Sequence, residues 1–197
     1  MTYKRIDLSN SDDLFTGRSS YQNEKFSKVL KTICVLKKPK RIVEFGILDG
    51  YSLDSFLDST DEECSIEAYD LFDDFPYNSA HLEKILAKYA EVKRVIIRKG
   101  DIFESAHLFD DNSVDIFHID VANNGEVYEF CIKNLMKKLK NTGVLVLEGG
   151  SEERDNCDWM LNYNKPKIRE VLQKYSGEYD IRVFNEFPSL TIIQNKI

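Results

Sequence analysis

The alternation of short apolar segments with amphipathic ones restricts the fold of this chain more than any other feature of its sequence. Segments rich in β-branched residues predict strands at 41–46, 65–70, 92–98, 114–120 and 143–147. Apolar residues spaced by three and four predict helices at 21–36, 50–57, 79–90 and 126–140. Strand–helix units that repeat with short connections predict a mainly parallel sheet joined by right-handed crossovers.

Two further strands are predicted at 179–184 and 190–194. The residues between them, 185–189, are too few for a parallel return, so these strands form a hairpin and the last one runs antiparallel. The predicted fold class is therefore α/β: a Rossmann-like, seven-stranded, mostly parallel sheet with helices on both faces and the last strand antiparallel. Because the chain has no internal repeat and no low-complexity linker, residues 1–197 are predicted to form a single domain.

The net charge of −7 bears on the partners of the protein. Nucleic-acid binding draws most of its affinity from clustered Lys and Arg, so no nucleic-acid partner is expected. Basic runs at 37–41 and 137–140 adjoin predicted helix ends, where cations interact favourably with the helix dipole. We interpret these runs as solvated helix ends.

The cysteines and the hydropathy pattern bear on location. The four cysteines, Cys34, Cys64, Cys131 and Cys157, lie far apart and form no C-x-x-C pair, which predicts reduced thiols in a cytoplasmic protein. No apolar run approaches the roughly 20 residues that a membrane helix needs, so no membrane partner is expected. A homo-oligomer is compatible with the sequence.

Acidic residues and glycines gather where the predicted strands end. In an open parallel sheet, ligands bind at the carboxyl ends of the strands, at the point where the winding direction switches. The residues at these ends are Glu44 and Gly46, Asp70, Asp101, Asp120 and Glu148. We expect them to line one crevice.

The first turn, 44–52, differs from a dinucleotide-binding turn. The G-x-G-x-x-G pattern starting at Gly46 requires glycines where Leu48 and Tyr51 stand, and no phosphate-binding loop occurs elsewhere. The turn leaves room for a nucleoside without a pyrophosphate, with backbone N–H groups and the Ser52 hydroxyl aimed at a carboxylate. Asp70, twenty residues beyond Gly50, is placed to accept hydrogen bonds from ribose hydroxyls; the alternative is that it caps a turn.

These segments resemble a known family. Residues 43–52, Val-Glu-Phe-Gly-Ile-Leu-Asp-Gly-Tyr-Ser, look like motif I of class I S-adenosylmethionine-dependent methyltransferases, in the variant of small-molecule and sugar O-methyltransferases. Residues 69–76 are similar to the stretch after strand two in macrolide-sugar O-methyltransferases. Residues 99–102 resemble the adenine-contacting motif, and 117–120 the acidic motif after strand four. The resemblance spans about 40–150.

The resemblance implies S-adenosylmethionine as cofactor and methyl transfer to a small-molecule substrate, a hydroxyl of a sugar or another metabolite. It divides the chain into a lead-in with a helix at 1–39, a cofactor-binding core at 40–150, and an acceptor-side segment with the hairpin at 151–197. The implied cofactor-binding residues are Glu44, Gly46, Gly50, Tyr51, Ser52, Asp70, Leu71, Asp101, Ile102 and Asp120.

Methyl transfer to a hydroxyl needs a group that removes a proton. Asp120 and Glu148, at neighbouring strand ends, are the predicted catalytic residues, either as base or as oxygen ligands of Mg²⁺. Related metal-dependent families carry Asp-Asp or Asp-Asn after strand five, where this chain has Glu148-Gly149-Gly150, so both alternatives stay open. His118 alternates with Asp120 along the strand and is predicted to support the site from beneath.

The acceptor side is less defined. Arg154 is interpreted either as a partner for a substrate carboxylate or phosphate or as a surface residue, and Tyr77 and Trp159 as residues that flank a ring. Two other functions remain as alternatives. A metal-dependent enzyme of another class needs a His-rich ligand set, and the chain has three histidines. The second alternative is a non-catalytic nucleotide-binding module with the same fold.

Overall fold

The computed structural model describes residues 4–6, 19, 21, 24–74, 79–185 and 187–196. Its strands are β1 (Lys4–Ile6), β2 (Arg41–Phe45), β3 (Ser65–Asp70), β4 (Val95–Lys99), β5 (Val114–Ile119), β6 (Leu139–Glu148), β7 (Tyr179–Phe184) and β8 (Leu190–Asn195). Its helices are α1 (Glu24–Lys37), α2 (Tyr51–Leu57), α3 (Leu82–Tyr89), α4 (Ile102–Ser105), α5 (Gly125–Leu135), α6 (Glu152–Asp155), α7 (Asp158–Asn162) and α8 (Ile168–Tyr175). None of these described helices is long and apolar enough to cross a bilayer.

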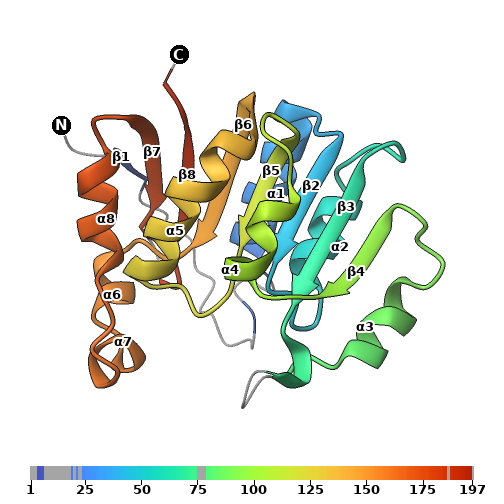
Figure 1. The fold of residues 1–197 in the computed structure, drawn as a ribbon, viewed down its shortest axis with the longest axis horizontal. Helices are drawn as coiled ribbons and strands as arrows, with labels where there is room; N and C mark the ends of the chain where they lie inside the picture. Colours follow the sequence, from blue (N-terminus) through green and yellow to red (C-terminus); the bar gives the residue numbers. More distant parts are fainter. Residues whose placement is uncertain are drawn as a thin grey trace.

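The strands form one sheet in the order β1-β7-β8-β6-β5-β2-β3-β4 (Figure 1). Strand β8 runs antiparallel to both β6 and β7, whereas the other pairs are parallel. The seven predicted strands and the antiparallel last strand are confirmed. The short strand β1, which pairs with β7 at the edge, was not predicted because three residues are too few to show a periodicity.

Helices cover both faces of the sheet, as the alternation predicted. One apolar cluster joins the sheet to α5 and α8, and a second joins it to α1, α2 and α3. Figure 1 shows α5 in front of the sheet and α8 at its left end, with α1 and α2 behind it. Strand β5 serves both clusters: Phe117 belongs to the first and Ile116 to the second. A strand buried on both faces is expected to read as a continuous apolar run.

Two expectations after β5 need correction. The predicted helix 126–140 ends at Leu135, because a 3₁₀ turn (Met136–Lys138) follows and Leu139 already pairs with Val114 in the sheet. Helix α8 was not predicted, although its apolar residues have helical spacing. The basic runs lie only partly at helix ends. Lys37 is in the last turn of α1 and donates to the Thr142 carbonyl, whereas Lys140 lies in β6 and pairs with Asp115.

The winding direction switches between β2 and β5. The chain runs from β2 outward through β3 to β4 and then returns to β5 on the other side of β2. The carboxyl ends of β2 and β5 meet in close backbone contact, where the Asp120 N–H donates to the Phe45 carbonyl at 2.8 Å. On the other side of β2, the Gly46 N–H donates to the carbonyl of Tyr69 in β3 at 2.8 Å. Gly46 has a φ of +93°, and a Cβ atom on it would clash with the Asp120 carbonyl oxygen. So close a contact between the two backbones requires glycine at position 46.

We expect Gly46→Ala to destabilise the protein by more than about 2 kcal/mol, because the variant adds backbone strain to a clash with backbone atoms. The free energy of unfolding from urea denaturation measures the effect. The matched control is Gly177→Ala, where an added Cβ meets nothing within 4 Å, so its change stays below about 1 kcal/mol. Equal stabilities of the two variants would contradict the requirement for glycine at 46.

Candidate functional site

A cavity of about 540 Å³ opens at the carboxyl edge of the sheet, beside the switch between β2 and β5. Seven of the residues predicted to bind the cofactor line it: Gly46, Ser52, Asp70, Leu71, Asp101, Ile102 and Asp120. The structure thus brings the ends of four strands to one crevice. Glu44, Gly50, Tyr51 and Glu148, also predicted site residues, lie outside its lining.

Gly50 and Tyr51 shape the turn that enters the cavity wall. Gly50 caps α2 with a φ of +82°, and its carbonyl accepts a hydrogen bond from the Tyr89 hydroxyl at 2.8 Å. The ring of Tyr51 faces the Lys88 ammonium, which lies 5.8 Å from the ring centroid. Both residues contact α3, so their place in the structure is to hold the turn.

Asp70 and Asp101 each combine a structural hydrogen bond with a place in the cavity wall. The Asp70 carboxylate accepts from the Ile47 N–H at 2.7 Å and from the Phe72 N–H at 2.8 Å, and so holds the first turn against the second. Asp101 caps α4 by accepting from the Phe103 N–H at 2.7 Å. The capping interpretation of Asp70 therefore holds, and it coexists with the position of this residue in the cavity.

Asp120 differs from these acids because its carboxylate has no hydrogen-bond donor among the described residues. It follows β5 and is partly exposed toward the cavity, while protein encloses its other sides. Burial raises the pKa of Asp120 to about 6, and the nearby Glu44 carboxylate adds to the rise. A carboxylate of this kind is ionised at neutral pH and is a stronger base than an exposed one.

A buried polar chain lies beneath the cavity and joins β2 to β5. Glu44 Oε1 accepts from the Ser52 hydroxyl and lies 2.8 Å from His118 Nδ1. His118 Nε2 lies 2.6 Å from the Tyr21 hydroxyl. Glu44 and His118 are fully buried, and Glu44 Oε2 has no hydrogen-bond partner among the described residues. His118 thus supports the site from below, where the sequence predicted it.

Residues 43–148, more than half of the chain, match the family described as "Methyltransferase domain". The chain belongs to this methyltransferase family. Its fold is the Rossmann-like fold of class I methyltransferases, which solved structures of other proteins share. No curated protein sequence matches the chain.

Three solved structures illustrate the shared fold. The chain is similar to the Podospora anserina methyltransferase PaMTH1 bound to SAH, with a TM-score of 0.64 and 18% identity over 87% of this chain and 78% of that one. It resembles an O-methyltransferase from Bacillus cereus in complex with SAH, with a TM-score of 0.68 and 13% identity over 93% and 94%. The chain is also similar to the O-methyltransferase TomG from Streptomyces achromogenes, in complex with SAM and involved in tomaymycin synthesis. The TM-score is 0.63, and the identity is 16% over 88% of this chain and 80% of TomG.

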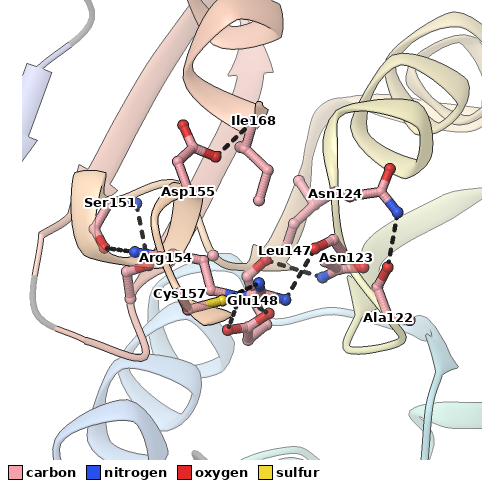
Figure 2. A network of polar contacts seen from close by, with 12 residues as sticks. Ala122, Asn123, Asn124, Leu147, Glu148, Ser151, Arg154, Asp155, Cys157 and Ile168 are labelled. Atoms are coloured by element: carbon pink, nitrogen blue, oxygen red, sulfur yellow. Dashed lines mark hydrogen bonds and ion pairs between the residues drawn. The ribbon is translucent and has the colours of Figure 1, made fainter. Parts of the chain in front are cut away.

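Glu148 of this methyltransferase lies in an internal ion pair (Figure 2). Arg154 Nε donates to both of its carboxylate oxygens, at 3.1 and 3.3 Å, and Arg154 Nη2 donates to the Asn123 carbonyl at 2.9 Å. The guanidinium carbon lies 5.2 Å from the centroid of the Trp159 ring. Burial raises the pKa of Glu148, and the positive charge of Arg154 opposes this rise. Arg154 is therefore not a surface residue. Its guanidinium is engaged by protein groups, and both Arg154 and Trp159, which packs on it, lie outside the cavity lining.

The residues present do not fit the magnesium site that the sequence suggested. The oxygens of Glu148 accept from Arg154, which leaves Asp120 as the one member of the predicted pair that faces the cavity. Within the described ranges, no group of three or more His, Cys, Asp or Glu residues is placed to hold a metal ion. Hard cations such as Mg²⁺ need several oxygen ligands.

Several cavity residues of the methyltransferase escaped the sequence analysis. Ser19 and Tyr21 precede α1, and Asn124, Glu126 and Lys165 lie around the start of α5. No local pattern marks the first two, because their position depends on packing against distant strands. Asn124 carries a signal, since its side chain accepts from the Glu126 N–H as an N-cap. Tyr77, predicted to flank a ring, lies outside the described residues.

We expect Arg154→Met to destabilise the methyltransferase by about 3–5 kcal/mol, because it leaves the buried Glu148 carboxylate without its partner. Glu148→Gln added to Arg154→Met recovers part of this loss. Urea denaturation at pH 6 and pH 9 measures both variants. Without Arg154 the pKa of Glu148 rises further, so the loss is smaller at pH 6, where Glu148 takes up a proton, than at pH 9.

The control for this prediction is Lys31→Met, which breaks an exposed ion pair with Asp58. An exposed pair contributes about 0–1 kcal/mol, so this variant stays close to the wild type. A loss in Arg154→Met no larger than that in Lys31→Met would contradict the structural role of the buried pair.

Proposed function

We propose that this methyltransferase transfers a methyl group from S-adenosylmethionine to a hydroxyl of a small molecule, a sugar or another metabolite. The observation that carries the proposal is the Asp120 carboxylate. It faces the cavity beside the glycine turn, it has no hydrogen-bond donor among the described residues, and its pKa is raised to about 6. A proton acceptor of this strength suits an acceptor hydroxyl, which must lose its proton on methylation.

The amino-acid end of the cofactor is assigned to the glycine turn and to Glu44, which lies just outside the cavity lining. Glu44 Oε2 is buried without a partner, and an ammonium group is the kind of donor that satisfies such an oxygen. We propose Glu44, Gly46 and Ser52 for the amino-acid end of the cofactor. When bound, S-adenosylmethionine supplies the methyl group on a sulfonium.

For the nucleoside end, we propose Asp70 with Leu71 at the ribose and Asp101 with Ile102 at the adenine. All four residues line the same cavity as Asp120. Each of the two carboxylates already accepts backbone hydrogen bonds, so each is held in place before a ligand arrives. The SAH- and SAM-bound O-methyltransferases of similar fold support the choice of S-adenosylmethionine as the cofactor.

The reaction is an in-line displacement, for which the protein must align the acceptor oxygen and remove its proton. As the new oxygen–methyl bond forms and the sulfur–methyl bond breaks, Asp120 accepts the proton of the hydroxyl and becomes neutral. The internal pair of Glu148 and Arg154 holds α6 beside this site and takes no proton in the proposal.

We expect S-adenosylmethionine and S-adenosylhomocysteine to raise the melting temperature, and NAD and ATP to leave it unchanged. A ligand present at 100 times its Kd stabilises the native state by about 2.7 kcal/mol. In a chain of this size that corresponds to a rise of roughly 5–10 °C. Differential scanning fluorimetry measures the shift. If neither sulfur nucleoside moves the midpoint, the proposed cofactor is wrong.

We expect Asp120→Asn to lower turnover at least about 100-fold, the contribution typical of a general base. Its affinity for S-adenosylhomocysteine stays within about twofold, because the amide has nearly the same shape. The assay follows formation of S-adenosylhomocysteine with a panel of sugars and hydroxylated metabolites. Asp110→Asn, which alters an exposed carboxylate, is the matched control.

The pH profile of kcat tests the same base in the wild type. Asp120 must be ionised to accept a proton, so activity falls as the pH drops through about 6 and levels off above pH 7. Asp120→Asn loses this inflection. If the variant is fully active, or if kcat of the wild type does not fall at acidic pH, Asp120 is not the base.

A further inference from the structure

The polar chain beneath the cavity ends on Tyr21, which none of the methyltransferase motifs contains. Tyr21 precedes α1, His118 lies on β5 and Glu44 on β2, so three distant parts of the chain meet there. Tyr21 is 4% exposed and lines the cavity together with Ser19. It therefore connects the buried chain to the space that a ligand enters.

With His118 in its neutral form, the hydrogens of this chain have one direction. Glu44 Oε1, a carboxylate oxygen, receives the Ser52 hydroxyl and accepts from His118 Nδ1, so Nδ1 carries the hydrogen. A neutral imidazole then has a lone pair on Nε2. The Tyr21 hydroxyl, 2.6 Å away, donates to that lone pair.

Packing holds the two rings in this arrangement. The Tyr21 ring meets the His118 ring edge to face, with centroids 4.9 Å apart, and Phe56 packs on His118 at 5.5 Å. The Phe26 ring also packs edge to face on Tyr21, with the ring centroids 6.5 Å apart. Burial also raises the pKa of the Tyr21 hydroxyl well above its usual range, so the phenol keeps its hydrogen. The Tyr21 hydroxyl therefore has a hydrogen to donate to a neutral His118.

We propose that Tyr21 is a specificity-determining residue that presents only a hydrogen-bond-accepting oxygen to the cavity. With its hydrogen committed to His118, the phenol oxygen accepts from a ligand and does not donate to it. The acceptor substrate that fits carries a second donor, a hydroxyl or an N–H group, beside the hydroxyl that Asp120 deprotonates. An ether, a carbonyl or a carboxylate at that place meets an oxygen with no hydrogen to offer.

This inference rests on the proposed function for the identity of the reacting hydroxyl, whereas the direction of the hydrogen bonds can be tested without any ligand. The chain has only three histidines, and His81 and His107 are exposed. In ¹⁵N-histidine-labelled protein at pH 7.5, long-range ¹H–¹⁵N spectra should show His118 as the Nδ1–H tautomer. Tyr21→Phe should move the Nε2 resonance toward that of a free imidazole lone pair.

The matched control for the spectra is Tyr175→Phe, which removes a phenol hydroxyl bonded to Glu129 on the α5–α8 side. It should leave the His118 resonances unchanged. If wild-type His118 is instead an imidazolium or the Nε2–H tautomer, Tyr21 donates to the cavity and the inference is overturned. This result does not depend on whether S-adenosylmethionine binds, so it separates failure of the inference from failure of the proposed function.

Selectivity gives the second readout. For the best acceptor of the panel, the analogue that lacks the neighbouring donor should lose at least about tenfold in kcat/KM with the wild type, because a site built to bond a hydroxyl rejects its deoxy analogue. Tyr21→Phe should bring the two acceptors to within about twofold, and Tyr175→Phe should keep the wild-type ratio. Unchanged discrimination in Tyr21→Phe would overturn the assignment.

Discussion

The close backbone contact between the ends of β2 and β5 is the constraint on which the site depends. Gly46 has no room for a side chain because the Asp120 carbonyl lies against it, and the Asp120 N–H is bonded to Phe45. The same contact starts the glycine turn, which Asp70 then fixes through the Ile47 N–H. The backbone contact between Gly46 and Asp120, where the winding direction of the sheet switches, thus fixes the positions of the glycine turn, of Asp120 and of the cavity between them.

Two acids at neighbouring strand ends have opposite environments. Glu148 is buried and bonded to Arg154, whereas Asp120 faces the cavity without a donor among the described residues. The paired acid stabilises the local structure, since Arg154 also bonds the Asn123 carbonyl and Asn123 bridges the carbonyls of Ile119 and Glu148. The unpaired acid is left for chemistry. Burial raises the pKa of both acids, so their different roles follow from their hydrogen-bond partners and from their positions relative to the cavity.

The sequence predicted what local pattern and topology determine. Apolar runs fixed seven strands, and the rule for parallel sheets placed Gly46, Asp70, Asp101 and Asp120 at one edge, where the structure has them. Contacts between segments that lie far apart in the chain could not be predicted from local sequence patterns. Tyr21 lines the cavity while its hydroxyl contacts His118 of a distant strand, and Glu148 is bonded to Arg154, which reaches it from α6.

The polar chain from Tyr21 to Glu44 also bears on how the site forms during synthesis of the protein. Its residues come from before α1, from β2 and from β5, and β5, the neighbour of β2 in the sheet, is synthesised after β3 and β4. Contacts of such long sequence separation form late and slowly. A nascent chain or fragment that ends before residue 118 therefore lacks the central histidine, and with it the contact that joins Glu44 to Tyr21.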